Sequence, residues 1–424
     1  MQIFEFSMKV FKFGGASVKS ANAIINLAKI IDKQTDRLVI VISAMDKTTN
    51  ALEKIAMNYF WKSPDILTQI QPLRDFHFGI LDDLFTYKEH KVYKEVEAWF
   101  AEMEHKIAKQ PSLDFDYEYD QIVSYGELIS TTIVSNYFNE IELKNNWVDI
   151  RDCLKTGSEF RDAVIDWELS KDLTNKTLTE LTERILITQG FIGSTINNIT
   201  TTLGREGSDF TAAALTYILD ADQIIIWKDV EGIYNADPEH FNHFEKLSTI
   251  SYQEAIELAY FGAKVIHPKT IKPLQNKGIP LFVKSFLAPE AEGTIIQTIE
   301  GNLSLPPVYI IKQNQILISI SPKDFSFIAE DNLSKIFALF AKYRIKINIS
   351  ENSAISFSVC VDWDESRTPG ILKNLQQEYK IKYNTDLTLI TIRHYTEDAL
   401  EKMTEGRKVL LEQRSRTTVR LVVI

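Results

Sequence analysis

Short apolar runs alternate with helical stripes along the N-terminal part of the chain. Lys9–Phe13 is predicted to be a strand that ends at Gly14 and Gly15. Apolar residues within 24–31 then recur at i, i+3, i+4 and i+7, which is the spacing of a helix with one buried face. Arg37–Ile42 is a continuous apolar run, as expected for a strand buried on both faces. This order of strand, loop and helix predicts an α/β fold with a parallel sheet.

The same alternation continues to about residue 300. Residues 64–139 are expected to be mostly helical, and Ser251–Glu254 has the order of a capping box that opens a further helix. Further strands are predicted at Trp147–Ile150, Ile185–Thr188, Gln223–Trp227 and Pro280–Lys284. Glycine, asparagine, serine and two prolines cluster at Gly301–Pro307, which indicates a linker. We therefore expect a first domain over residues 1–300.

After the linker the pattern becomes a repeated β-α-β-β unit. The first unit, over about residues 316–385, is predicted to contain strands at Ile316–Ser321, Lys346–Ser350 and Ser356–Val361 and helices at Leu333–Lys342 and Thr368–Tyr379. The second unit, over about residues 386–424, is predicted to contain strands at Leu387–Arg393, Val409–Gln413 and Val419–Val423 and a short helix at Glu397–Met403, with no room for a final helix. The repeat predicts two α+β modules in a second domain, residues 308–424.

Composition narrows the class of protein. The formal charge is −11 and 45% of the residues are hydrophobic, which argues against a nucleic-acid-binding protein and fits a globular one. The two cysteines, Cys153 and Cys360, form no CxxC pattern, so a disulfide framework or a zinc site is not expected. The N-terminus lacks the pattern of a signal peptide, whether translation begins at Met1 or Met8, and no apolar run reaches membrane-spanning length. We expect a cytoplasmic protein that does not enter a membrane.

Three loops at predicted strand ends contain residues suited to anion binding. In the first, Gly14 and Gly15 follow Lys12, so that backbone N–H groups and an ammonium can face an anion. In the second, Arg205 lies between glycines at the start of a helix, where Ser208 and Asp209 are expected to form the cap. Taken singly, these two loops could also be a plain glycine turn and a capped helix.

The third loop, residues 227–238, follows a buried strand and could equally be a plain long loop. The chain has neither a Walker phosphate loop nor the glycine-rich loop of protein kinases. His267 precedes Pro268 and is expected to end or begin a helix rather than to act as a base. Any phosphate site is therefore expected to be built without a known short phosphate motif.

Seven segments, taken in order, resemble the signatures of the amino-acid kinase family, and within it those of the aspartate kinases. They are KFGGASV (12–18), VISAM with TTN (41–50), SYGELIS (124–130), TQGFIG (188–193), TTLGREGSDFTAAAL (201–215), WKDVEGIYNADP (227–238) and FGAKVIHPKT (261–270). The resemblance implies a three-layer amino-acid kinase fold followed by two ferredoxin-like ACT modules. In these proteins the segment after the linker, Val308–Ile311, would complete the sheet of the second module.

The resemblance also implies an activity. The chain would transfer the γ-phosphoryl group of ATP, with Mg²⁺, to the side-chain carboxylate of L-aspartate, at the start of lysine, threonine and methionine biosynthesis. No protein ligand to the metal is predicted, because Mg²⁺ prefers phosphate oxygens and water. The alternatives are another carboxylate or carbamate kinase of the superfamily, or a non-catalytic or altered-specificity amino-acid sensor.

The roles implied for single residues follow the same resemblance. Lys12 would stabilise the transferred phosphoryl group, and Asp209 would organise the site. The aspartate-binding residues would be Ser43, Thr49, Glu127, Arg205 and Ser208, with Arg205 on the α-carboxylate and Glu127 near the ammonium. The nucleotide would be bound by Gly14, Gly15, Lys228, Asp229, Tyr234 and Lys264.

Several positions depart from the family pattern. Ala16 replaces a threonine, Glu206 replaces a glycine, and Glu231 and Glu239 replace a proline and a basic residue. The added acids near the ATP site are the features that favour the sensor alternative, whereas an intact set of Lys12, Arg205 and Asp209 favours an active kinase.

The regulatory region departs as well. The first ACT module lacks the usual glycine turn before its first helix, and it has Asn348 where an acid is common. An amino-acid effector, lysine or threonine, is expected at these modules, with feedback inhibition lost, altered or directed to another ligand. The modules are also expected to form a homodimer or a higher homo-oligomer.

Overall fold

The computed structural model describes residues 7–64, 66–263, 266–301, 303–324 and 326–424. Contacts within the chain divide it into two compact units. Described residues 7–233, 248–256 and 266–301 belong to the first unit, and 234–247, 257–263 and those after 302 belong to the second. The domain limits given above, 1–300 and 308–424, stay a prediction.

The first unit is built on an eight-stranded sheet in the order β10-β12-β11-β7-β1-β2-β4-β3. Its strands are β1 (Met8–Phe13), β2 (Arg37–Ile42), β3 (Asn145–Val148), β4 (Ile185–Gln189), β7 (Gln223–Lys228), β10 (Thr249–Ser251), β11 (Leu281–Ser285) and β12 (Thr294–Gln297). Neighbouring strands are parallel except β11 and β12. The predicted α/β class with a mostly parallel sheet is confirmed.

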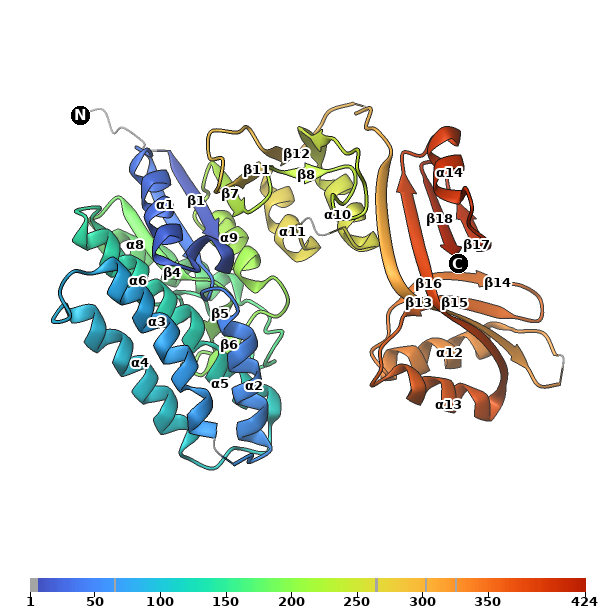
Figure 1. Cartoon of the computed structure of the whole chain (residues 1–424), viewed down its shortest axis with the longest axis horizontal. Coiled ribbons are helices and arrows are strands. Elements are labelled where there is room, and N and C mark those ends of the chain that lie inside the picture. The colour runs from blue at the N-terminus through green and yellow to red at the C-terminus, as the bar shows by residue number, and fades with distance from the viewer. Residues whose placement is uncertain (1–6, 65, 264–265, 302, 325) are drawn as a thin grey trace. The chain divides into compact units, whose positions relative to one another are not determined.

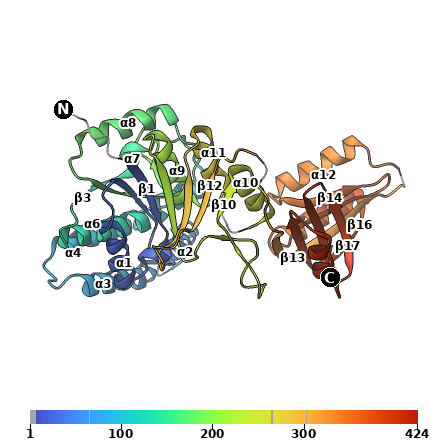
Figure 2. The same cartoon turned by 90° about the horizontal axis from the view of Figure 1, so that it is seen from above.

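Helices cover both faces of this sheet (Figures 1 and 2). One face packs against α9 (Gly207–Ile218), and α7 (Ile150–Cys153), α8 (Trp167–Glu180) and α11 (Pro268–Lys277) lie on the same side (Figure 2). The other side holds α1 (Ala21–Asp32), α2 (Thr48–Phe60), α3 (Gln71–Leu84), α4 (Lys91–Ile107), α5 (Phe115–Val123) and α6 (Tyr125–Glu140). The smaller elements are the 3₁₀ turns η1 (Gly15–Val18) and η2 (Ile66–Gln69), the pair β5 (Ile192–Ser194) and β6 (Thr200–Thr202), and α10 (Tyr252–Phe261). The three layers agree with the implied amino-acid kinase fold.

The register of the central strands explains where a site can form. Lys12 on β1 lies level with Val41 on β2 and with Ile226 on β7. These strands are parallel, so the loops after all three leave the sheet at the same edge, where open α/β sheets bind their ligands. Buried rings stiffen this centre, because Trp227 stacks on Phe13 with 5.7 Å between ring centroids.

Local capping fixes the ends of several elements. Ser20 accepts a hydrogen bond from the N–H of Ala23 and caps α1, and Ser251 accepts one from the N–H of Glu254, as the capping-box prediction required. The strand predicted at Trp147–Ile150 is wrong in its bounds. Asp149 accepts the N–H of Arg151 and starts α7, so the strand ends at Val148.

The second unit contains a six-stranded antiparallel sheet in the order β14-β15-β13-β16-β18-β17. Its elements are β13 (Val308–Pro322), α12 (Glu330–Lys342), β14 (Ile347–Asn352), β15 (Phe357–Asp362), α13 (Thr368–Glu378), β16 (Tyr379–Arg393), α14 (Glu397–Thr404), β17 (Val409–Arg414) and β18 (Thr418–Val423). The short pair β8 (Ile233–Tyr234) and β9 (Lys246–Leu247) precedes them.

Two strands run through both predicted modules. The start of β13, Val308–Lys312, pairs with Leu389–Arg393 of β16, and its remainder pairs with the first half of β16. The expectation that the segment after the linker completes the second module's sheet is therefore confirmed. The predicted limit between residues 385 and 386 falls inside β16, where Asp386 has a left-handed φ of 58° beside a register shift.

Candidate active site

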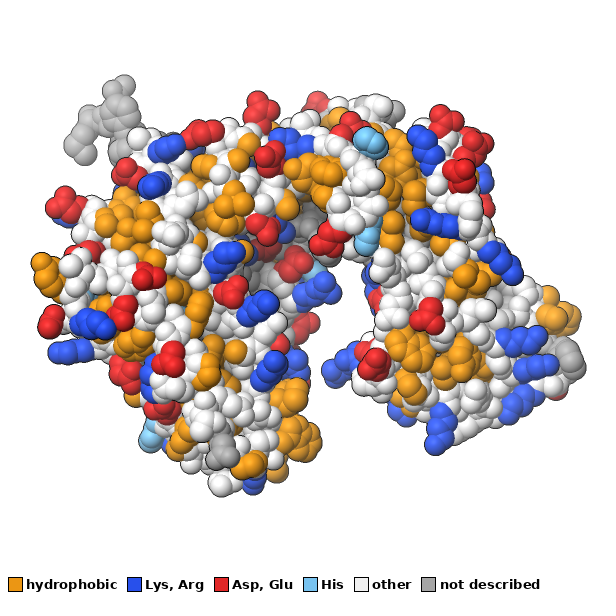
Figure 3. Space-filling model, in the orientation of Figure 1, with side chains coloured by type: hydrophobic (Ala, Val, Ile, Leu, Met, Phe, Trp, Pro, Cys, Tyr) orange, Lys and Arg blue, Asp and Glu red, His pale blue; other side chains and the backbone are white. Residues whose placement is uncertain are grey.

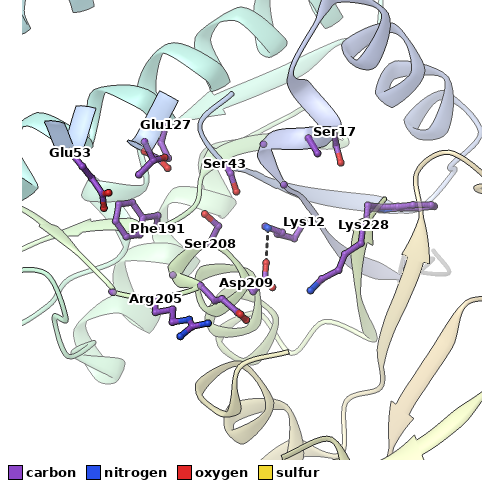
Figure 4. A pocket seen from close by; sticks show the side chains of 18 of the residues that line it. Lys12, Ser17, Ser43, Glu53, Glu127, Phe191, Arg205, Ser208, Asp209 and Lys228 are labelled. Carbon is purple, nitrogen blue, oxygen red and sulfur yellow. Dashed lines mark ion pairs between the residues drawn. The ribbon is translucent and has the colours of Figure 1, made fainter. Parts of the chain in front are cut away.

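A cavity of about 680 Å³ opens at the carboxyl edge of the parallel sheet. It brings together residues of all three loops singled out from the sequence (Figure 4). The predicted residues that line it are Lys12, Gly14, Gly15, Ser43, Thr49, Glu127, Arg205, Ser208, Lys228, Asp229 and Asp209. Eleven of the thirteen predicted side chains or glycines thus meet in one cavity.

Lys12 and Asp209 form the innermost charged contact. The Lys12 Nζ lies 2.6 Å from Oδ1 of Asp209, and the two side chains are 12% and 6% exposed. Asp209 is in the first turn of α9, so it comes from the helix that packs on the strand that carries Lys12. An ammonium held by a strand and by a buried carboxylate has little freedom, so it is positioned before an anion arrives.

The glycine turn after β1 is required by a close approach of two loops. A Cβ on Gly15 would lie 2.7 Å from the carbonyl oxygen of Ala44, a distance that real Cβ atoms do not adopt. A Cβ on Gly14 would meet only the Lys12 Nζ, at 3.4 Å. Gly15 therefore allows the loop after β2, which begins at Ser43, to sit against the loop after β1.

Glu127 is a fully buried carboxyl group on α6. Its Oε1 accepts the N–H of Ala44 at 3.3 Å, while its Oε2 is closed off from solvent with no hydrogen-bond partner in the described part of the chain. Burial raises the pKa of Glu127 to about 8, against the opposing effects of the Ala44 N–H and the charge of Lys12. A cationic ligand placed beside it would favour the ionised form and lower this pKa.

The helix α9 starts differently from the prediction. Its N-cap is Glu206, in a left-handed conformation with φ 54°, and its side chain does not cap the helix. The expected Ser208-Asp209 cap is therefore wrong, because both residues lie in the first turn and face the cavity. Arg205 is exposed at the cavity edge, next to the N–H groups and the positive dipole end of the helix.

Glu206 also contacts the opposite loop. Its Oε2 accepts the backbone N–H of His267 at 2.9 Å. His267 caps α11 by accepting the N–H of Lys269, as its predicted helix-end role required, and burial lowers its pKa. The left-handed φ explains why glycine suits this position, and the His267 contact shows what a glutamate does there instead.

The predicted nucleotide-binding residues are distributed unevenly. Lys228, at the end of β7, and Asp229 after it both line the cavity. Tyr234 belongs to β8 and to the second unit, where its ring meets Phe244 edge-on at 5.1 Å. Lys264 lies outside the described residues.

The cavity is also lined by side chains to which the sequence gave no role in the site. Among them are Glu53, Tyr119, Arg161 and Phe191. Tyr119 is on α5, within residues 64–139 that were expected only to be mostly helical, and Glu53 is on α2, so no strand-end loop pointed to either residue. Arg161 has a left-handed φ of 68°, which the sequence did not signal, whereas Phe191 was within reach because it lies inside the TQGFIG segment.

A metal site made by the chain alone is not evident. Across the described ranges, no group of three or more histidine, cysteine, aspartate or glutamate side chains is placed to hold a metal ion.

None of the described helices has both the length and the apolar content needed to cross a membrane. On the face of the first unit seen in Figure 3, basic and acidic side chains are interspersed.

The model of the amino acid kinase family matches residues 7–285, which is more than half of the chain. The chain belongs to the amino-acid kinase family. Within that family, it is 30% identical over 396 residues to lysine-sensitive aspartokinase 3 of Escherichia coli (strain K12), with 90% of this chain and 86% of the relative covered. It is thus a member of the aspartokinases.

Solved aspartokinase structures match this family member along nearly its whole length. The structure of E. coli aspartokinase III in complex with lysine and aspartate has a TM-score of 0.84, 28% identity, and coverage of 98% of this chain and 96% of that one. The complex of the same enzyme with aspartate and ADP has a TM-score of 0.82.

A bifunctional aspartokinase/homoserine dehydrogenase of Arabidopsis thaliana is 35% identical over 296 residues, and this chain spans about a third of its length. The similarity therefore concerns only the matched part of that relative, and it gives no argument for a dehydrogenase activity in this chain.

Proposed function

We propose that this aspartokinase-family protein transfers the γ-phosphoryl group of ATP to the side-chain carboxylate of L-aspartate, the entry step to lysine, threonine and methionine biosynthesis. The single observation that carries the proposal is the cavity in which the Lys12–Asp209 pair, Arg205 and the buried Glu127 meet. Arg205 could pair with a carboxylate of the amino acid, Glu127 with its ammonium group, and Lys12 with a phosphate.

The chemistry that the residues supply is mainly positioning and neutralisation of charge. Two carboxylates and a triphosphate repel one another, so cationic groups must hold them at reacting distance. Lys12 would contact the transferred phosphoryl group, Arg205 the α-carboxylate, and Lys228 and the α9 N-terminus the phosphates. The attacking side-chain carboxylate is already an anion, so the transfer needs no general base.

The proposal includes Mg²⁺ bound together with ATP. This ion takes oxygen ligands and keeps several waters, and Asp209 and Asp229 are two of the carboxylates on the wall of the cavity. Asp209 is already engaged with Lys12, so phosphate oxygens and water would hold most of the ion. When bound, the ion would neutralise charge on the β- and γ-phosphates.

The second unit is proposed to receive an amino-acid effector and to form the homodimer. Asn348 is already held by other residues, because its Oδ1 accepts the Lys312 Nζ at 3.0 Å while its amide donates to Gln315 and Asp362. We therefore expect lysine or threonine, if it inhibits at all, to bind without displacing Asn348. Initial rates measured with each amino acid at up to millimolar concentrations test the proposed effector, and light scattering, which gives the molar mass, tests the proposed homodimer. A monomeric protein that lysine inhibits strongly through Asn348 would contradict both proposals.

Hydroxylamine trapping tests the reaction itself. Purified protein is incubated with ATP, Mg²⁺ and a panel of carboxylic acids, and the acyl phosphate is captured as a hydroxamate. We propose that the protein carries out this reaction in the cytoplasm. Hydroxamate from aspartate alone is the expected result. Hydroxamate from a different acid would move the chain to another kinase of the superfamily, and none from any acid, with folded protein, would identify the non-catalytic sensor.

A further inference from the structure

A second carboxylate lies at the Glu127 end of the cavity. Glu53 on α2 and Glu127 on α6 both line it, and these two helices pack against each other. Figure 4 shows the two side chains at the same end of the cavity, with the ring of Phe191. Glu53 lies outside all seven segments that resemble the family signatures.

A hydrogen bond orients the Glu53 carboxylate. The hydroxyl of Tyr119 donates to its Oε1 at 2.5 Å. Burial, and then the hydrogen bond to Glu53, raises the pKa of Tyr119 far above its usual range, so this hydroxyl stays a donor. One oxygen of Glu53 is thus fixed, and its Oε2 has no partner among the side chains and backbone groups described.

The Tyr119 ring is itself held in place. The guanidinium of Arg161 lies 4.4 Å from the ring centroid, and its Nη1 is 3.2 Å from Oδ1 of Asp116. Only 7% of Tyr119 is exposed. Successive contacts therefore fix the orientation of the Glu53 carboxylate on the cavity wall. They run from Asp116 to Arg161, from Arg161 to Tyr119 and from Tyr119 to Glu53.

Glu127 alone is a poor receiver for an ammonium group. An ammonium has three N–H donors, whereas at Glu127 Oε1 already accepts from Ala44 and only Oε2 has no partner within the described part of the chain. Burial also keeps Glu127 protonated around neutral pH while the cavity is empty. A second carboxylate that a hydrogen bond already orients would supply further acceptors for the ammonium group.

We propose that Glu53 is a substrate-binding residue that, together with Glu127, takes the α-ammonium group of the amino-acid substrate and selects it over the same dicarboxylate without an amino group. The proposal rests on the proposed function. It concerns binding and not the phosphoryl transfer, because Figure 4 shows Glu53 at one end of the labelled side chains, with Phe191 and Ser208 between it and the Lys12–Asp209 pair.

The test compares a charged and an uncharged ligand in the Glu53→Gln variant. We expect KM for L-aspartate to rise by on the order of tenfold, with kcat and KM for ATP unchanged. The inhibition constant of succinate, which has both carboxylates and no ammonium, is expected to stay the same or fall. Tyr119→Phe, which removes only the orienting hydroxyl, is expected to raise KM for aspartate by a smaller factor, and it carries the test if Glu53→Gln does not fold.

Glu102→Gln is the matched control. Glu102, on α4, also accepts a tyrosine hydroxyl, that of Tyr125 at 3.2 Å, but it is not one of the residues that line this cavity. Its KM for aspartate should equal the wild-type value. An unchanged KM in Glu53→Gln, or equal losses for aspartate and succinate, would overturn the assignment, whereas absence of product from the wild-type protein would overturn the proposed function instead.

Discussion

Lys12 on β1 and Asp209 on α9 share a buried ion pair with 2.6 Å between Nζ and Oδ1, although 196 positions separate them in the sequence. We expect Lys12→Ala to lower kcat by about 10³-fold, because it removes the cation that is proposed to contact the transferred phosphoryl group. The same change leaves Asp209 buried without a partner and should lower the free energy of unfolding by about 3 kcal/mol. Urea unfolding and steady-state kinetics check the two effects.

A double variant separates the catalytic role of this pair from its structural one. Lys12→Met with Asp209→Asn replaces both charges by neutral groups of similar size, so most of the lost stability should return while the rate stays low. If the double variant regains the rate together with the stability, Lys12 has no direct role in the transfer.

Glu127 gives aspartate binding a pH dependence of known sign. Its pKa is about 8 in the folded protein and 4.5 without the surroundings, so between these values the folded state holds a proton that the unfolded chain has released. Its contribution to stability is therefore fully present below about pH 4.5 and is lost as the pH rises to about 8. Binding an ammonium requires the ionised form, so KM for aspartate should fall as the pH rises from about 6 to about 8.

The Glu127→Gln variant supplies the comparison. It should bind aspartate more weakly at every pH, without the fall in KM, and its melting temperature should decrease less than that of the wild type between about pH 5 and about pH 8. A wild-type KM that stays level over this range contradicts the assigned role of Glu127.

Gly15 and Gly14 form a matched pair for substitution. Gly15→Ala forces a Cβ to 2.7 Å from the Ala44 oxygen, so the loop that begins at Ser43 must move. We expect a loss of about 1–3 kcal/mol in stability and a decrease of kcat/KM for aspartate. Gly14→Ala, with its nearest neighbour at 3.4 Å and φ −78°, should fold as the wild type does. Thermal unfolding of both variants decides, and equal melting temperatures would show that the close approach is not needed.

Glu206 adds negative charge at the cavity edge. Glu206→Gln keeps an acceptor for the His267 N–H and removes the charge, so KM for ATP should fall by about two- to fivefold at low salt. Added salt should reduce the difference, because the interaction is between exposed charges. A KM for ATP that stays the same or rises at low ionic strength would show that Glu206 does not act on the nucleotide electrostatically.

The sequence was sufficient to predict the parts of the site that depend on local pattern. The apolar run of β2 and the glycine turn after Lys12 indicated a parallel sheet and the edge of that sheet where the cavity lies. The resemblance added roles for residues such as Glu127 that no loop pattern had marked. The α/β class and most of the cavity follow from such features, because parallel strands with buried faces leave few alternatives.

Long-range packing set what the sequence did not predict. Glu53 enters the cavity because α2, α5 and α6 pack together and because the Tyr119 hydroxyl orients its carboxylate. The N-cap of α9 is Glu206 and not the predicted Ser208 and Asp209, because the left-handed conformation of Glu206 ends the preceding turn. Neither the position of Glu53 in the cavity nor the start of α9 can be predicted from the hydrophobic periodicity of a single helix.

The uninterrupted strands β13 and β16 have a consequence for how this protein can be altered. Removal of everything after residue 385 would take away the pairing partner of Val308–Lys312 and expose a strand edge, which invites aggregation. The regulatory region therefore cannot be exchanged or shortened one half at a time. A recombinant or evolutionary exchange has to carry both halves as one piece, and a ligand that distorts one half must bend the backbone shared with the other.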